Sequence, residues 1–188
     1  MSGPAPPPTS RASAADLIVV RGQLGRRPHE LQRIAARCPF GWPAAVEDLP
    51  YDAKGRPFPT LYYLTCPTLV AGVGRLESAG GVRAWTARLE VDSALARSLR
   101  EAAAVTRRRR RTLALRLGRP MADGGASLRT GVGGVHDVRA VKCLHAHVAH
   151  ALAHRTYAFG AAVLAEVEDP WCADRRCAAF AGPDGGEP

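Results

Sequence analysis

The sequence lacks long hydrophobic runs, and it has few aromatic residues. No segment approaches the about 18 consecutive apolar residues of a membrane-spanning helix, and the apolar stretch 17–20 is too short for the core of a signal peptide. Aromatic residues make up 6% of the chain, and none is interleaved with the arginine run 107–111, where stacking on bases would need them. These absences predict a cytoplasmic protein without a membrane anchor.

Cysteine is also scarce, and its spacing is uninformative by itself. The chain has five cysteines, an odd number, and no two of them are spaced as Cys-x-x-Cys. An odd number argues against a complete disulfide framework, and cytoplasmic thiols stay reduced. We therefore expect the cysteines to be metal ligands, buried small side chains or reactive thiols. The chain contains neither an internal repeat nor a nucleophile-elbow motif.

The composition fits one globular domain with a basic surface. The chain has 188 residues, of which 46% are hydrophobic, so it is long and apolar enough to bury a core. Its formal charge of +9 favours polyanions, and a nucleic-acid or other polyanion-binding module is one functional alternative. However, five arginines in a row on a helix spread around its axis, so a solvated helix explains 107–111 better. The partner stays unknown: a protein partner is possible, and nucleic acid or another polyanion is not favoured.

Helix signals recur along the chain. Ser13 with Asp16 three residues later predicts an N-terminal cap, Pro67 suits the start of a helix, and Asp92 or Ser93 suits another cap. The Gly-rich segment 118–137 predicts a loop. The expected helices cover residues 14–24, 28–37, 67–79, 82–89, 93–117, 139–154 and 160–167.

Two strands interrupt the helices. Residues 44–49 and 60–65 have strand-forming composition, and the segment 50–59 between them is rich in turn-forming residues. We expect an α+β fold that is mostly helical, a single compact domain with one two-stranded β-hairpin. The domain should span residues 13–177, between a disordered Pro-rich tail at 1–12 and a disordered Gly/Pro tail at 178–188.

A cluster of one thiol and several imidazoles gives the strongest functional signal. On a helix over 139–154, Cys143, His147, His150 and His154 share one face, because the positions are three or four residues apart. His154 lies nearly three turns from Cys143, too far to share an ion with it. If Cys143 instead precedes the helix, His145 becomes a possible ligand.

Two distant cysteines complete the predicted site. Cys38 and Cys66 lie about equally far from the turn of the expected hairpin, so both should reach its open end. Together with Cys143 and either His150 or His147 they would form a Cys3His site for Zn²⁺, with a structural or regulatory role. We predict no catalytic residue.

Other interpretations of the cysteines stay open. A thiol-dependent enzyme would pair one thiolate with His145, His147 or His150, oriented by a carboxylate such as that of Asp137. The thiols can also simply fill the core. An iron–sulfur cluster on three of the cysteines is less favoured than zinc. The pair Cys172-x4-Cys177 would be a second ligand pair, a disulfide or an incidental feature of the tail.

Three sequence blocks resemble an uncharacterised bacterial family, DUF501, which is common in actinobacteria. The blocks are Arg37-Cys38-Pro39-x-Gly41-x-Pro43, the run from Pro57 to Pro67, and the run from Val141 to His150. The resemblance covers roughly residues 14–177. It implies no activity, because none is established for the family. Cys38, Cys66, Cys143, His145 and His150 match its blocks, and His147 matches less regularly, which favours His150 as the fourth ligand.

Overall fold

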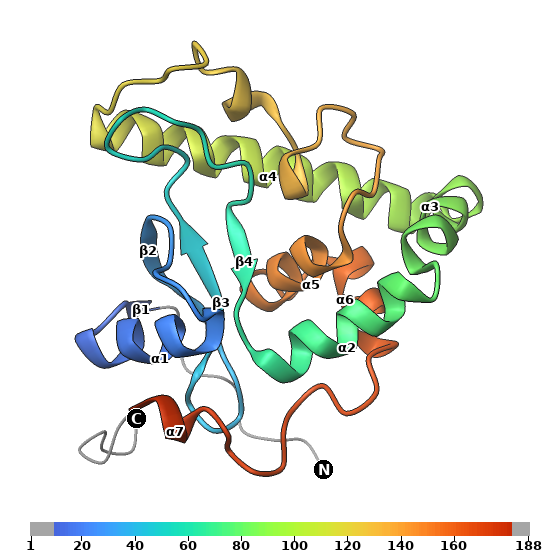
Figure 1. Ribbon diagram of the computed structural model, residues 1–188. Helices are drawn as coiled ribbons and strands as arrows, with labels where there is room; N and C mark the ends of the chain where they lie inside the picture. Colours follow the sequence, from blue (N-terminus) through green and yellow to red (C-terminus); the bar gives the residue numbers. More distant parts are fainter. Residues whose placement is uncertain (1–9, 182–188) are drawn as a thin grey trace.

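A small antiparallel sheet lies at the centre of the molecule, with helices on both of its faces (Figure 1). The computed structural model describes residues 10–181. The strands follow the chain in the order β1-β2-β3-β4, and each pairs with its sequence neighbour. They are β1 (Ser10–Arg11), β2 (Leu31–Arg37), β3 (Pro43–Asp48) and β4 (Tyr62–Leu64). The fold is thus mostly helical α+β, as predicted.

The sheet is larger than the predicted two-stranded hairpin, because β2 replaces an expected helix. Leu31, Ile34 and Ala35 have helical spacing, which led to the prediction of a helix over 28–37. Instead, a turn with Gly41 at φ 84° reverses the chain, and Ile34 pairs with Val46 of β3. The pairing overrides the local helical pattern, because strand stability depends on neighbours that the pattern does not include.

The predicted strands at 44–49 and 60–65 form the β3–β4 pair. Ala45 faces Leu64 and Glu47 faces Tyr62 in an antiparallel register. The intervening segment is held by a turn at Asp52, whose carboxylate accepts hydrogen bonds from the backbone N–H groups of Lys54 and Arg56.

The helices begin and end close to the predicted capping residues. Ser13 and Asp16 form the capping box of the first helix, and Asp92 accepts two backbone N–H groups at the start of the longest one. The helices are α1 (Ala14–Leu24), α2 (Pro67–Ser78), α3 (Gly81–Val91), α4 (Ser93–Leu117), α5 (Leu144–Ala153), α6 (Ala158–Ala165) and α7 (Ala178–Ala181), with 3-10 turns at Ala126–Arg129 and Val132–Gly134.

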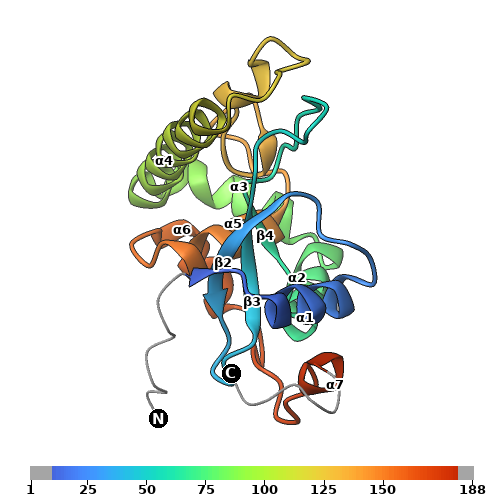
Figure 2. The ribbon, with the colours of Figure 1, turned by 90° about the vertical axis from the view of Figure 1, so that its left-hand side faces the viewer.

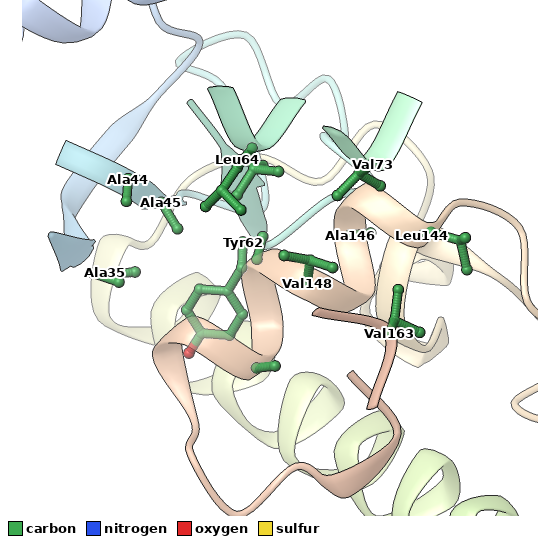
Figure 3. Packing of buried hydrophobic residues seen from close by; sticks show 14 of the residues in the cluster. Ala35, Ala44, Ala45, Tyr62, Leu64, Val73, Leu144, Ala146, Val148 and Val163 are labelled. Carbon is green, nitrogen blue, oxygen red and sulfur yellow. The ribbon is translucent and has the colours of Figure 1, made fainter. Parts of the chain in front are cut away.

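The main core lies between the sheet and α5. Figure 3 shows Leu64 of β4 beside Val148 of α5, with Val73 of α2 and Val163 of α6 around them. A smaller cluster of Val20, Ile34 and Val46 joins α1 to the other face of the sheet. The strands β2 and β3 therefore contribute to both clusters, with Ile34 and Val46 in the smaller one and Ala35 and Ala45 in the main core.

The chain after α6 runs past one end of the sheet to α7, which lies beside α1 (Figures 1 and 2). Its last helix, α7, occupies residues that the sequence analysis assigned to the C-terminal tail. Most of both predicted disordered tails, 1–9 and 182–188, lies outside the described residues. Across residues 10–181, no helix combines the length and the apolar character needed to cross a membrane.

Candidate functional site

Cys143 does not belong to a helix, which changes the geometry expected for the thiol–imidazole cluster. The helix predicted over 139–154 begins only at Leu144, and Cys143 is its N-cap with an extended backbone, φ −154°. Its thiol therefore leaves the stripe of His147 and His150. The alternative in which the cysteine precedes the helix and His145 becomes its neighbour is the one that the structure adopts.

Cys143, His145 and Glu77 converge at the junction of α2 and α5. The Sγ of Cys143 lies 3.8 Å from Nδ1 of His145, and the same nitrogen lies 3.2 Å from Oε1 of Glu77. One potential ligand atom of each residue lies within 4.8 Å of those of the other two. Within residues 10–181 no other three residues of the histidine, cysteine and acidic types are grouped so closely.

The other ring nitrogen of His145 fixes how the imidazole is oriented. Nε2 lies 3.0 Å from the carbonyl oxygen of Val70 in α2. A carbonyl accepts only, so Nε2 carries a proton and donates it. In the neutral imidazole this leaves the Nδ1 lone pair directed at Cys143 and Glu77, the arrangement that metal-binding histidines use.

Electrostatics at this junction favour charge on His145 when no cation is bound. The hydrogen bond with Cys143 is the largest influence and raises the pKa of His145 to about 9, although partial burial opposes it. The Val70 carbonyl and the Glu77 carboxylate add to the increase. Glu77 also accepts a hydrogen bond from the backbone N–H of Leu144 at 2.5 Å, so it caps α5 from another helix.

A hollow of about 330 Å³ opens beside two of the three residues. Cys143 and His145 form part of its wall, together with Lys142, Tyr63 and residues of β4 and the η2 turn. The side chains of His145 and Glu77 are each 26% exposed, so a small molecule or ion can reach them. The group thus combines potential ligands with access.

A comparison with protein-family models shows which family the chain belongs to. The model of a family described as "Protein of unknown function (DUF501)" matches residues 34–165. The chain belongs to the DUF501 family. The matched segment includes all three residues of the group at α2 and α5. No curated protein and no solved structure shows significant similarity to this DUF501 protein.

The histidines predicted as the fourth ligand are buried in the core of the DUF501 domain. His147 bonds through Nδ1 to the hydroxyl of Tyr157 at 2.7 Å, and Nδ1 of His150 lies 3.4 Å from Oγ1 of Thr106. Burial lowers the pKa of each histidine to about 3, so both rings are neutral. Neither histidine belongs to the three-residue group.

Cys38 and Cys66 lie at one end of the sheet, as the symmetry of the hairpin predicted, but not in the group that contains Cys143. Cys38 begins the β2–β3 turn and Cys66 is the N-cap of α2. Burial raises the pKa of both thiols, and the negative charge of Cys38 and Cys177 adds to the effect on Cys66. The five residues of the predicted site are therefore distributed over three places.

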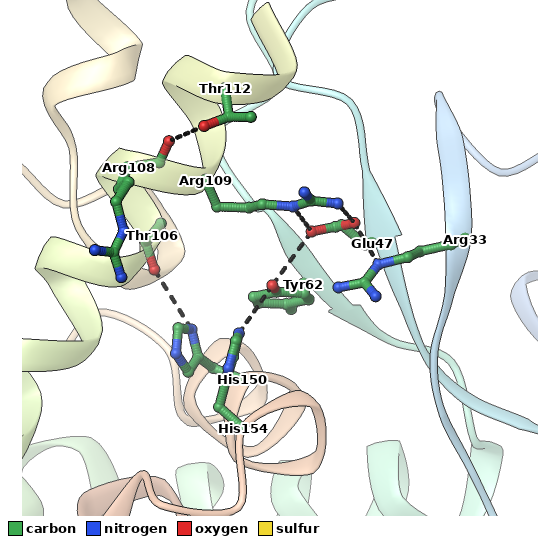
Figure 4. A network of polar contacts seen from close by, with 9 residues as sticks. All are labelled: Arg33, Glu47, Tyr62, Thr106, Arg108, Arg109, Thr112, His150 and His154. Atoms are coloured by element: carbon green, nitrogen blue, oxygen red, sulfur yellow. Dashed lines mark hydrogen bonds and ion pairs between the residues drawn. The ribbon is translucent and has the colours of Figure 1, made fainter. Parts of the chain in front are cut away.

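Part of the arginine run of α4 is used inside the domain. Arg109 donates two hydrogen bonds to Glu47, at 2.7 and 2.8 Å, and Arg33 donates to the same carboxylate from β2 (Figure 4). Arg110 is fully buried and donates to the carbonyl oxygens of Phe58 and Pro59. Two of the five arginines thus connect α4 to the sheet and its loop rather than forming part of a solvated face.

Sequence reasoning missed Glu77 and gave His145 only conditionally. Glu77 is 66 residues from Cys143 and is one of several acidic residues on predicted helices, so no sequence signal singled it out. Asp137, the carboxylate proposed for the thiol enzyme, is exposed and pairs with Arg139 instead. The absence of a capping side chain at the start of α5 explains the error in its N-terminal boundary.

Proposed function

We propose that this DUF501 protein binds a divalent transition metal, preferably Zn²⁺, through Glu77, Cys143 and His145. The observation that carries the proposal is that a thiol, an imidazole nitrogen and a carboxylate oxygen lie within 4.8 Å of one another, with the cysteine and the histidine in the wall of a hollow. Sulfur, nitrogen and oxygen donors are the ligands that zinc takes in proteins. The backbone carbonyl of Val70 supports the ligand role of His145 by holding Nε2 as the donor.

The donor set favours an open site over a closed structural one. Zinc sites that serve only structure usually have four protein ligands, whereas three protein ligands leave a position for water or another molecule. The group at α2 and α5 supplies three protein ligands, and the hollow borders two of them, so a further ligand can approach from it. Lys142 on the same wall would attract an anionic group toward it. A regulatory or chemical role fits this arrangement better than the purely structural one.

The proposal includes a cytoplasmic location. A thiolate ligand must stay reduced, and the cytoplasm maintains that state. The ligand set also replaces the predicted Cys3His combination with one cysteine, one histidine and one glutamate.

Zinc content is the direct test. The full chain is purified with a reductant and without added metal, and its zinc is measured beside that of Cys143→Ser and His145→Gln. Each variant should lose about one equivalent of zinc relative to the parent protein. His136→Gln is the matched control, because His136 is exposed and lies outside the group. Equal zinc in the parent and in both variants would refute the proposal.

A thiol-dependent enzyme is the second candidate, and one observation favours it. The Sγ of Cys143 lies beside the imidazole of His145, whose pKa is raised to about 9, and a thiol with a neighbouring imidazole is the arrangement of a cysteine nucleophile with its base. This candidate predicts rapid alkylation of Cys143 by iodoacetamide near neutral pH in metal-free protein, and slow alkylation in His145→Gln. Equally slow alkylation of both proteins would reject it, whatever the zinc content.

A further inference from the structure

A second hollow lies between the C-terminal turns of α4 and the segment that follows this helix. The segment folds back over α4, and its η1 turn (Ala126–Arg129) contacts the helix (Figure 1). The hollow has a volume of about 540 Å³, within the range of about 300–1,000 Å³ that is typical of sites for small ligands. None of the residues that line it belongs to the hollow beside Cys143, so the two places are separate.

Hydrogen bonds hold the loop that forms one wall of this hollow. The carboxylate of Asp123 accepts a hydrogen bond from the hydroxyl of Tyr51, at 2.7 Å. The same carboxylate accepts from the backbone N–H groups of Gly125 and Ser127, at 2.9 and 2.8 Å. The hydroxyl of Ser127 in turn donates to the oxygen of Tyr51, at 3.0 Å. Because the loop is fixed in this way, binding of a ligand requires little additional ordering of the chain.

Exposed apolar side chains line the hollow. Leu115 of α4 is 83% exposed, and Met121 of the loop is 45% exposed. Leu128 of the η1 turn and Ala114 of α4 belong to the same lining. Scattered apolar side chains are common on protein surfaces, but a group of them in a concave place is typical of a binding site. This apolar surface would contact the non-polar part of a ligand.

Three arginines also line the hollow, and no acidic residue does. Arg119 is already paired, because it donates to the carboxylate of Glu30, at 2.8 Å, and to the carbonyl oxygen of Tyr51, at 2.9 Å. Within residues 10–181, the exposed side chains of Arg111 and Arg129 make no ion pair or side-chain hydrogen bond. A guanidinium group binds a carboxylate or a phosphate through two N–H groups, so the hollow is complementary to an anion.

The size of the lining favours a small molecule over a macromolecule. A stable protein interface takes about 20–30 residues from each partner, whereas ten residues line this hollow. None of the ten is aromatic, so single-stranded nucleic acid would find no surface on which to stack its bases. A membrane offers a broad surface, whereas the apolar side chains here line a concavity.

We propose that this hollow binds a small amphiphilic anion, an apolar chain or ring that carries one carboxylate or phosphate group. The apolar part covers Leu115 and Met121, and Arg111 and Arg129 bind the anionic group. Arg111 lies one helical turn before Leu115, away from the C-terminal end of α4. The negative end of the helix dipole is at that C-terminal end and would repel the anionic group, so the group lies toward Arg111.

Decanoate, kept below the concentration at which it forms micelles, is the probe, and isothermal titration calorimetry measures its binding. The full chain should bind it at one saturable site. Decyltrimethylammonium, which has a similar chain and a positive headgroup, should not bind. Inorganic phosphate, which lacks an apolar part, should bind at least about 10-fold more weakly than decanoate, because it covers no apolar surface.

Substitutions at exposed positions assign the binding to this hollow without disturbing the core. Arg111→Gln and Arg129→Gln should each weaken the binding of decanoate roughly 3–10-fold, because each removes one exposed charge-assisted contact. Leu115→Asn should weaken it by a similar factor, because apolar contact is lost. Arg97→Gln is the matched control and should bind as the parent does, because Arg97 is an exposed arginine of α4 outside the hollow.

Two further measurements separate this site from the alternatives. Cys143→Ser should bind decanoate with unchanged affinity, which shows that the carboxylate is not held by a metal at the first site. Circular dichroism checks that each variant is folded.

Four results would overturn the proposal. The first is the absence of saturable decanoate binding to the parent protein, and the second is equal binding of decyltrimethylammonium. The third is a double variant, Arg111→Gln with Arg129→Gln, that binds decanoate as tightly as Arg97→Gln does. The fourth is protein that sediments with phosphatidylglycerol vesicles but does not bind decanoate, because the surface would then dock on a membrane.

Discussion

Replacement of Glu47 by glutamine tests the polar network that joins α4 to the sheet. The carboxylate of Glu47 is fully buried and accepts hydrogen bonds from Arg33, Arg109 and the hydroxyl of Tyr62 (Figure 4). That hydroxyl in turn lies 2.9 Å from Nε2 of His154. Burial would raise the pKa of Glu47, but the two arginines outweigh it and hold the pKa below its usual value. The carboxylate is therefore ionised in the folded protein at neutral pH.

The expected cost follows from what the substitution leaves behind. Glu47→Gln keeps one acceptor oxygen, but two guanidinium groups lose their counter-charge. Removal of one partner from a buried ion pair costs about 3–5 kcal/mol. The side chains of Arg33 and Arg109 are 26% and 28% exposed, so water compensates part of the loss. We expect a decrease of about 3 kcal/mol in the free energy of unfolding, which lowers Tm by roughly 6–12 °C for a domain of this size.

Urea unfolding followed by circular dichroism measures the effect. The stability from an acid with a lowered pKa is present above its unfolded pKa and disappears as the pH falls through the folded pKa. The difference between the parent and Glu47→Gln should therefore be full at pH 7 and shrink below about pH 4.5, the ordinary value for glutamate. Glu101→Gln, at an exposed position of α4, the helix that Glu47 binds through Arg109, is the control and should change stability by less than about 0.5 kcal/mol. A cost below about 1 kcal/mol, or one independent of pH, would refute the reasoning.

Three further substitutions test other buried or capping groups. Burial raises the pKa of Asp48 to about 7, above its value in the unfolded chain, so the stability of the parent protein falls as the pH rises from about 4 to 7. By urea midpoints, Asp48→Asn should therefore be more stable than the parent by roughly 2–4 kcal/mol at pH 8 and equally stable near pH 4. Arg110→Met leaves the carbonyl oxygens of Phe58 and Pro59 without their hydrogen-bond donor, so it should lower the free energy of unfolding by about 2–4 kcal/mol in the same assay. A variant as stable as the parent would mean that the cost of burying the cation offsets its hydrogen bonds. Ser13→Ala removes one half of the capping box of α1 and should cost about 1 kcal/mol in thermal unfolding; no change would show that Asp16 suffices.

The helices were predictable where a local side chain determines their ends. Ser13, Pro67 and Asp92 each mark the start of a helix by a hydrogen bond or a backbone restriction that the sequence displays directly. The strand β2 was not predictable, because the positions of Leu31 and Ile34 fit the spacing of a helix as well as a strand. Its partner, Val46, becomes adjacent only after the chain has turned at Gly41.

The candidate metal site was predictable only in part, for the same reason. Cys143 and His145 are two residues apart, so the sequence shows that they can meet once the cysteine lies outside the helix. Glu77 reaches them through the packing of α2 against α5, which no spacing reveals. Cys38, in the β2–β3 turn, and Cys66, at the start of α2, lie outside the group that contains Cys143.

The borders of the sheet limit how this protein can associate with copies of itself. The edge strands β1 and β4 have two and three residues, so each presents little unpaired backbone. A foreign strand that docked there would gain few hydrogen bonds, and long exposed borders are what allow sheets to grow from one molecule into the next. The brevity of β1 and β4 thus leaves little template for the addition of a foreign strand at either of them.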